Sequence, residues 1–218
     1  MNAAAVKAIF EALKSANPAP RTELEYGSTF QLLVAVILSA QATDRSVNAA
    51  TRALFVQAPD AASMLKLGLA RLKRHIRTIG LYNTKSANIL KTSRALLDLH
   101  GGGVPADRAA LEALPGVGRK TANVVLNAAF GQPTMAVDTH IFRVANRTGL
   151  ARGRTPRAVE DGLLQAIPAQ YLHDAHHWLI LHGRHVCKAR KPDCGRCIIA
   201  RWCNFPKKTM PAGAGQPR

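Results

Sequence analysis

Hydrophobic residues recur along the chain at helical spacing and predict helices over most of its length. The N-terminal segment is typical of a short amphipathic helix that ends at Asn17-Pro18. The most apolar run, 32–38, predicts a buried helix over 30–40 that is too short to cross a bilayer. Further helices are predicted from Asp44, as N-cap, through Leu54, then over 61–67, 69–78, 84–99, 107–113, 119–130, from Pro156 behind a Thr155 N-cap, and over 170–186. No run of five or more residues alternates as a strand does, so the predicted fold class is all-α.

Glycine and proline clusters divide these elements. Gly101-Gly102-Gly103 marks a clear break, and Gly131-Gln132-Pro133 marks a second one that is a candidate domain boundary. Residues 212–218 are expected to form a disordered tail. Residues 79–88 and 114–123 share a helix, a tight turn and then Lys, Ser or Thr, Ala and Asn, which suggests two related helical hairpins.

Charge indicates the kind of partner. The 218 residues contain 30 Lys and Arg against 13 Asp and Glu, a net charge of +17. A folded chain with this excess is typical of proteins that meet a polyanion, although a general solubility bias gives the same balance. An anionic membrane surface is disfavoured, because no amphipathic helix carries a one-sided basic face. The chain shows no signal peptide or spanning segment, so we expect a cytoplasmic protein in which disulfides are disfavoured.

The string LPGVGRKTA, residues 114–122, predicts a phosphate-binding turn. Gly116 and Gly118 can expose backbone N–H groups at the N-terminus of the helix that begins near Arg119, where the helix dipole favours an anion. Such a cradle positions nucleic acid without reading a base. An ordinary turn with a glycine C-cap would look similar, but the whole string resembles the helix-hairpin-helix motif of DNA-binding proteins.

Lys120 opens the following helix and has two possible roles. It can anchor a phosphate, or its neutral amine can attack a sugar C1′ and form a Schiff base. The helix dipole and Arg119 favour the neutral amine, whereas an ionised Asp138 nearby would oppose it. Lys85 holds the matching place in the other hairpin but lacks the paired glycines, so it is the poorer candidate.

Asp138 precedes a helical stretch with apolar positions at Ile141, Phe142 and Val144. It is a good N-cap for that helix. It is also a candidate carboxylate for stabilising positive charge on a sugar as a base leaves. The two roles are compatible.

The only four cysteines are spaced C-x₆-C-x₂-C-x₅-C, at Cys187, Cys194, Cys197 and Cys203. Four thiolates suit zinc or a [4Fe–4S] cluster, and the presence of a single C-x₂-C pair favours iron–sulfur over a Cys₄ zinc site. Many cations surround the ligands: Arg184, Lys188, Arg190, Lys191, Arg196, Arg201, Lys207 and Lys208. A metal that orders this basic loop would present positive charge to phosphates.

In this order and spacing, L-P-G-V-G-R-K-T-A, V-D-T-H and the four cysteines resemble the endonuclease III family of bacterial DNA glycosylases and abasic-site lyases. The segments at 32–44 and 79–85 match too, so the resemblance covers nearly all of the chain. It implies two helical domains, one over 22–132 with the helix-hairpin-helix and one combining 1–21 with 133–211 around the cluster. It also implies a monomer that acts on double-stranded DNA containing oxidised pyrimidines or abasic sites, associated with the bacterial nucleoid.

The resemblance also assigns roles to single residues. Lys120 matches the Schiff-base lysine, Asp138 the catalytic aspartate and the four cysteines the [4Fe–4S] ligands. Gln41 and Leu81 match residues that enter the duplex, and His140 is placed near the base pocket.

Three other functions fit the sequence less well. A related adenine glycosylase would lack Lys120 and carry a further C-terminal domain. A non-catalytic DNA-binding module would need neither Lys120 nor Asp138. An electron-transfer protein would not account for the basic charge or the hairpin.

Overall fold

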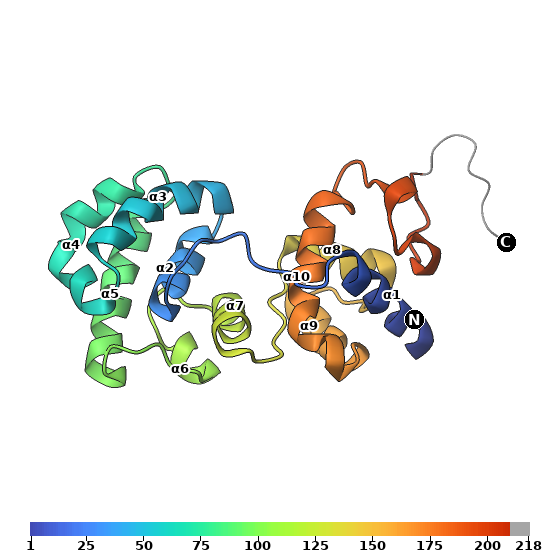
Figure 1. The fold of residues 1–218 in the computed structure, drawn as a ribbon, viewed down its shortest axis with the longest axis horizontal. Helices are drawn as coiled ribbons and strands as arrows, with labels where there is room; N and C mark the ends of the chain where they lie inside the picture. The colour runs from blue at the N-terminus through green and yellow to red at the C-terminus, as the bar shows by residue number, and fades with distance from the viewer. Residues whose placement is uncertain (210–218) are drawn as a thin grey trace. The chain divides into compact units, whose positions relative to one another are not determined.

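The computed structural model describes residues 1–209, so the tail predicted over 212–218 lies outside the described residues. Within residues 1–209 the chain is helical, with no strand, which confirms the all-α fold class (Figure 1). The helices are α1 (Ala3–Ala16), α2 (Thr29–Ser39), α3 (Asp44–Gln57), α4 (Ala61–Ile76), α5 (Tyr82–His100), α6 (Arg108–Glu112), α7 (Arg119–Phe130), α8 (Thr139–Thr148), α9 (Pro156–Ala166) and α10 (Ala169–His185), followed by the 3₁₀ turns η1 (Cys194–Arg196) and η2 (Ala200–Trp202). None of the described helices is long and apolar enough to cross a membrane.

The helices form two compact units. The continuous unit is Thr22–Gln132, and the discontinuous unit combines Met1–Arg21 with the chain from Pro133 onward. Each unit has its own hydrophobic core.

The continuous unit is built around α2. Eight of its residues are buried, from Phe30 to Leu38, because the apolar run at its centre leaves no polar face. Helices α3, α5 and α7 pack around it (Figure 1). Gly68, at φ 78° and ψ 166°, kinks α4 where the sequence predicts two separate helices.

The discontinuous unit depends on contacts between the two ends of the sequence. The ring of Phe10 in α1 lies 5.9 Å from that of Tyr171 and 6.2 Å from that of Trp178, both in α10. The Trp178 Nε1–H donates to the Asn17 carbonyl at 2.8 Å. The first helix is therefore part of a core that only the second half of the chain can complete.

The predicted N-cap of α3 is wrong by one residue. Thr43, not Asp44, is the N-cap of α3, and its Oγ1 accepts from the Ser46 N–H at 3.2 Å. Thr43 has the extended backbone that a cap needs (φ −81°, ψ 148°), and Asp44 becomes the first helical residue, where an acidic side chain favours the helix dipole. The Thr155 cap is confirmed, with its Oγ1 accepting from the Ala158 N–H at 3.2 Å.

Candidate active site and metal centre

The predicted phosphate-binding turn joins α6 to α7 in the continuous unit. Leu114 and Val117 are 3% and 5% exposed and anchor the turn in the core. The Thr92 hydroxyl of α5 donates to the Pro115 carbonyl at 2.7 Å and holds the turn from the other side. The backbone at 116 and 118 is therefore presented on a rigid support.

The two glycines of this turn serve different needs. Gly116 has φ +80°, and a Cβ there would lie 2.8 Å from Nδ2 and 2.9 Å from Cβ of Asn88. Gly118 has φ −95°, which any residue adopts, and a Cβ there would meet nothing within 4 Å. The fold therefore requires glycine at 116, whereas at 118 glycine leaves open space beside the N-terminus of α7.

Lys120 lies in the first turn of α7 and is exposed. Within residues 1–209 no hydrogen bond or ion pair engages its amine, while the neighbouring Arg119 lies 3.7 Å from Glu112. The N-cap Gly118 provides no side-chain cap to the helix. The amine and the first N–H groups of α7 therefore lie together at one exposed helix end.

Gln41 and Leu81 have the left-handed backbone conformation, at φ 58° and φ 60°. They are the only non-glycine residues with positive φ in the described part of the chain. Leu81 is 63% exposed, although Ile79, two residues before it, is only 2% exposed and the following Tyr82 packs against the core. Both turns thus hold an exposed side chain in a conformation that ordinarily favours glycine.

Lys85 is buried and contacts the end of α2. Its Nζ donates to the carbonyls of Leu38 at 2.8 Å and Ala40 at 2.5 Å. Burial lowers the pKa of Lys85. This amine has no exposed surface comparable to that of Lys120, which explains structurally why the two matching lysines of the sequence repeat differ.

Asp138 is the N-cap of α8 in the discontinuous unit. Its Oδ1 accepts from the N–H groups of His140 at 2.9 Å and Ile141 at 2.8 Å. Both bonds fall on one carboxylate oxygen, so capping leaves the other oxygen for a second role. The predicted cap is confirmed.

His140 is held between α8 and α10. Its Nδ1 lies 3.2 Å from Nη2 of Arg143, and that guanidinium also donates to the Gly183 carbonyl at 2.8 Å. A Cβ on Gly183 would lie 2.8 Å from the Cβ of His140, so the close approach of the two helices requires glycine. The position of His140 is therefore fixed by packing.

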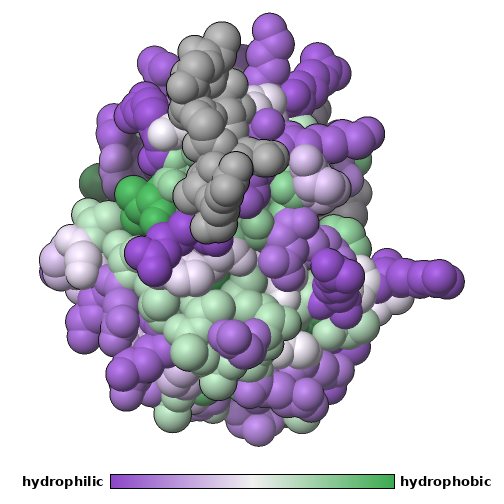
Figure 2. Space-filling view, turned by 90° about the vertical axis from the view of Figure 1, so that its right-hand side faces the viewer, coloured by the Kyte–Doolittle hydropathy of each residue, from purple (hydrophilic) through white to green (hydrophobic). Residues whose placement is uncertain are grey.

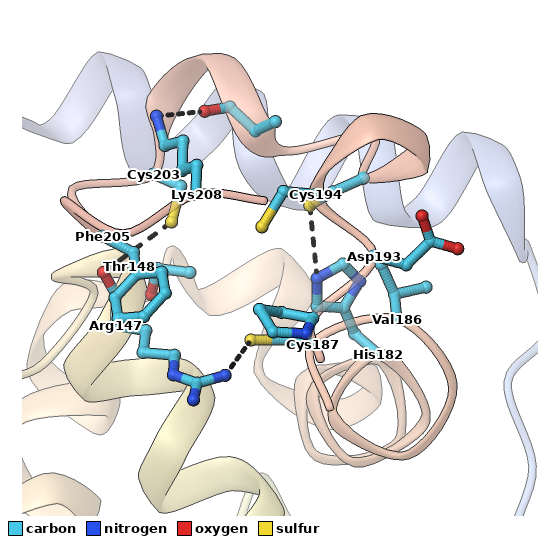
Figure 3. Close-up of a pocket in the computed structure, with 13 residues that line it drawn as sticks. Arg147, Thr148, His182, Val186, Cys187, Asp193, Cys194, Cys203, Phe205 and Lys208 are labelled. Carbon is cyan, nitrogen blue, oxygen red and sulfur yellow. Dashed lines mark hydrogen bonds between the residues drawn. The ribbon is translucent and has the colours of Figure 1, made fainter. Parts of the chain in front are cut away.

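The four cysteines line one cavity of about 360 Å³, counting the part that opens to solvent (Figure 3). Cys187 follows α10, Cys194 begins η1, Cys197 follows η1 and Cys203 follows η2. In Figure 3 the sulfurs of Cys187, Cys194 and Cys203 point toward this shared space. Burial raises the pKa of Cys197 to about 11 and raises that of Cys203, so thiolates at this depth need a cation to compensate their charge.

Polar groups around the cavity fix the cysteine loop. Arg147 donates to the Cys187 sulfur at 3.7 Å and to the carbonyls of Lys188 and Ala189, both at 2.8 Å. The imidazole Nε2 of His182 lies 3.6 Å from the Cys197 sulfur. These contacts hold the loop against α8 and α10.

The arrangement of the cysteines fits a polynuclear cluster better than one zinc ion. Four thiolates around a single zinc, at about 2.3 Å each, would place their sulfurs about 3.8 Å apart. Within residues 1–209 no three Cys, His, Asp or Glu side chains converge closely enough to hold one ion. All four cysteines nevertheless surround the same cavity, as ligands of a larger group would.

The loop that carries these ligands is basic at its surface. Lys191 is exposed, and the Arg196 side chain is 87% exposed beside the half-exposed carboxylate of Asp193 at 3.6 Å. Hydrophilic side chains cover much of the face shown in Figure 2. The loop can therefore present positive charge to solvent.

The predicted site residues fall in two groups. The continuous unit holds Gln41, Leu81, Gly116, Gly118 and Lys120, and the discontinuous unit holds Asp138, His140, Lys191 and the four cysteines. Sequence reasoning missed Asn88, Arg143 and Arg147. Only the two arginines had a signal, because they lie four residues apart on the helix that Asp138 begins, so that they share a face toward the cysteine loop.

Comparison with known proteins adds to this geometry. Residues 34–169 match the family described as HhH-GPD superfamily base excision DNA repair protein, and residues 187–203 match the iron–sulfur binding domain of endonuclease III. Endonuclease III of Escherichia coli (strain K12) is 60% identical over 208 residues, covering 95% of this chain and 99% of that protein. Endonuclease III of Haemophilus influenzae is 58% identical over 92% of this chain and 95% of its own length. A trapped endonuclease III–DNA covalent intermediate superposes with a TM-score of 0.87 at 40% identity, covering 93% of this chain and 96% of that one.

Proposed function

Because the chain belongs to the endonuclease III family of base excision DNA repair proteins, we propose that it removes oxidised pyrimidines from double-stranded DNA. It is a DNA glycosylase and abasic-site lyase with a [4Fe–4S] cluster. The observation that carries the assignment of its chemistry is the exposed, unpaired Lys120 amine at the N-terminus of α7, beside the open space at Gly118.

The turn over 113–118 binds the DNA backbone. A phosphate that enters the open space at Gly118 meets the uncapped N–H groups of α7 and the positive end of its dipole. These contacts carry no sequence information, so they hold damaged and undamaged DNA alike. The exposed Lys191 in the cysteine loop adds further positive charge for DNA binding.

Gln41 and Leu81 enter the duplex. Flipping a damaged nucleotide out of the stack costs a few kcal/mol, and side chains that fill the gap offset part of this cost. The exposed Leu81 is suited to stack in place of a base, and the amide of Gln41 can hydrogen-bond the base left without a partner. We also assign His140 to the recognition of the flipped base, as the resemblance to the endonuclease III family implies.

Lys120 is the nucleophile. The lone pair of its amine forms a bond to C1′, and the electrons of the glycosidic bond leave with the base, which takes up a proton. Opening of the sugar gives an imine between Lys120 and C1′. Loss of a C2′ proton then expels the 3′ phosphate by β-elimination, which cuts the strand.

Asp138 stabilises the positive charge that develops on the sugar while the base departs. Its Oδ1 is committed to the cap of α8, so the other oxygen carries this electrostatic role. Since the cap fixes the carboxylate, little reorganisation is needed during the reaction.

Cys187, Cys194, Cys197 and Cys203 hold the cluster, whose iron–sulfur bonds order the segment from 187 to 203. The proposed reaction moves no electron through it. We also infer that the enzyme acts as a monomer, because one chain supplies the lysine, the aspartate and the cluster, and that it associates with the nucleoid through DNA binding. Size-exclusion chromatography with light scattering tests the first of these, and imaging of a tagged chain tests the second.

Borohydride trapping tests the proposed chemistry. Borohydride reduces an imine to a stable amine, so the protein should become fixed to a duplex carrying an abasic site. Lys120→Gln should abolish the adduct while DNA binding persists, and Lys85→Gln should still form it. An adduct with Lys120→Gln would contradict the assignment.

A further inference from the structure

Lys85 connects the two turns that carry Gln41 and Leu81. Its Nζ donates to the carbonyls of Leu38 and Ala40, the last turn and C-cap of α2, immediately before Gln41. Lys85 lies in the first turn of α5, where its backbone N–H makes the regular helical bond to the carbonyl of the N-cap Leu81 at 3.0 Å. A single residue, 6% exposed, thus joins the end of α2 to the beginning of α5.

Both turns have a backbone that glycine would adopt at lower cost. The Ala42 N–H donates to the Ser39 carbonyl at 3.0 Å and closes a turn in which Gln41 has φ 58°. Leu81, at φ 60°, is the N-cap of α5 without a side-chain cap bond. If the turns alone mattered, glycine would suffice at either position. The presence of an exposed side chain on a strained backbone at both positions indicates that each turn holds its side chain in place for a function.

A lysine that only capped α2 could do so from the surface, where its charge would stay hydrated. Here the amine is buried, and burial lowers the pKa of Lys85, which means that the ammonium form is held against the cost of desolvation. Its partners are the carbonyls of Leu38 and Ala40, at the end of α2 where the strained turn begins. The bonds therefore restrict the segment that must stay rigid when a side chain is pushed into a base stack.

We infer that Lys85 is a positioning residue, which holds Gln41 and Leu81 in the arrangement in which they fill the gap left by the flipped nucleotide. This inference rests on the proposed role of those two side chains. Lys85 neither contacts the reacting atoms nor forms the imine.

The test compares duplex and single-stranded DNA of one sequence, each carrying one abasic site. Lys85→Met keeps the apolar stem and removes the ammonium group. Loss of its charged hydrogen bonds should lower kcat/KM on the duplex by about tenfold or more. On the single strand, where no base pair has to be opened, the rate should stay within about twofold of the wild type. Rates are normalised to the trappable fraction, and Lys91→Met, exposed on the same helix, is the matched control.

A spectroscopic measurement separates positioning from stability. With 2-aminopurine opposite the abasic site, wild-type enzyme should raise the fluorescence as the orphan base unstacks, and Lys85→Met should reduce this rise at saturating protein. An equal loss on duplex and single strand, or an unchanged fluorescence rise, would overturn the inference. If circular dichroism shows that Lys85→Met does not fold, Lys85→Gln, which retains an amide donor, takes its place. It is tested by the same comparison of the rate on duplex DNA with the rate on single-stranded DNA.

A cycle of variants distinguishes this inference from the function on which it rests. Gln41→Ala combined with Leu81→Ala should slow the duplex reaction, and adding Lys85→Met should then slow it little further. If the two alanines leave duplex cleavage unchanged, the proposed role of Gln41 and Leu81 fails. If they slow it and Lys85→Met still slows it by its full factor, only the positioning role fails.

Discussion

Alanine at Gly116 should damage the fold, whereas alanine at Gly118 should damage only DNA binding. At 116, φ +80° costs a residue with a Cβ roughly 1–2 kcal/mol. The Cβ would also lie 2.8 Å and 2.9 Å from Asn88 atoms, and overpacking of this kind costs about 1–3 kcal/mol. Together these give about 2–5 kcal/mol, which for a chain of this size lowers Tm by about 4–20 °C.

Gly118→Ala meets none of these costs. Its φ of −95° suits alanine, and the added Cβ faces open space, so the free energy of unfolding should change by no more than about 0.5 kcal/mol. The methyl group would occupy the space assigned to a phosphate. Losing hydrogen bonds to that charged group should weaken DNA binding by about 10–100-fold.

Thermal denaturation and fluorescence anisotropy with damaged and undamaged duplexes measure both effects on the same preparations. Gly118→Ala should melt with the wild type and lose affinity for the two duplexes to the same extent. The reasoning is refuted if Gly118→Ala is as unstable as Gly116→Ala, if it binds DNA normally, or if its loss is confined to damaged DNA.

Two further predictions concern the discontinuous unit. Asp138→Asn keeps a good N-cap and removes the charge, so it should melt at the wild-type temperature yet lower the rate of base excision by about 100-fold or more. Asp138→Ala should lose, in addition, about 1 kcal/mol of the free energy of unfolding. A wild-type rate for the asparagine variant would exclude the electrostatic role. Purified protein should be yellow-brown with about four irons per chain, and Cys197→Ser should leave the segment from 187 to 203 open to protease, because the cysteine ligands order it; colourless, zinc-loaded and fully active protein from iron-replete cells would contradict the cluster assignment.

The sequence predicts the helices and the local motifs because both depend on neighbouring residues. Helical periodicity locates the buried α2, and the Asp138 cap follows from a short polar residue before an apolar stripe. The N-cap of α3 differs from the prediction by one residue, Thr43 instead of Asp44. Either side chain can cap a helix, and the conformation of the preceding turn determines which of them does so.

Contacts between distant residues could not be predicted in this way. Lys85 and Ala40 are 45 residues apart, and Arg147 and Cys187 are 40 apart. No periodicity encodes such pairs. Sequence comparison of the two lysines favours Lys120 over Lys85 as the nucleophile but gives no role for the Lys85 amine, because its partners are the carbonyls of Leu38 and Ala40 at the end of another helix.

The order in which the ribosome makes this chain has a consequence for α1. The buried residues of α1, Val6, Ile9, Phe10 and Leu13, are synthesised well before their partners on α10, since Trp178 comes 161 residues after Asn17. At a synthesis rate of about 5–20 residues per second, the apolar face of α1 stays without its packing partners for about 10–30 s. The continuous unit can fold during that interval, since its hydrophobic core is formed by residues within Thr22–Gln132. During synthesis the nascent chain thus contains a folded continuous unit preceded by α1, whose apolar face is still unburied. That face is where a chaperone would bind.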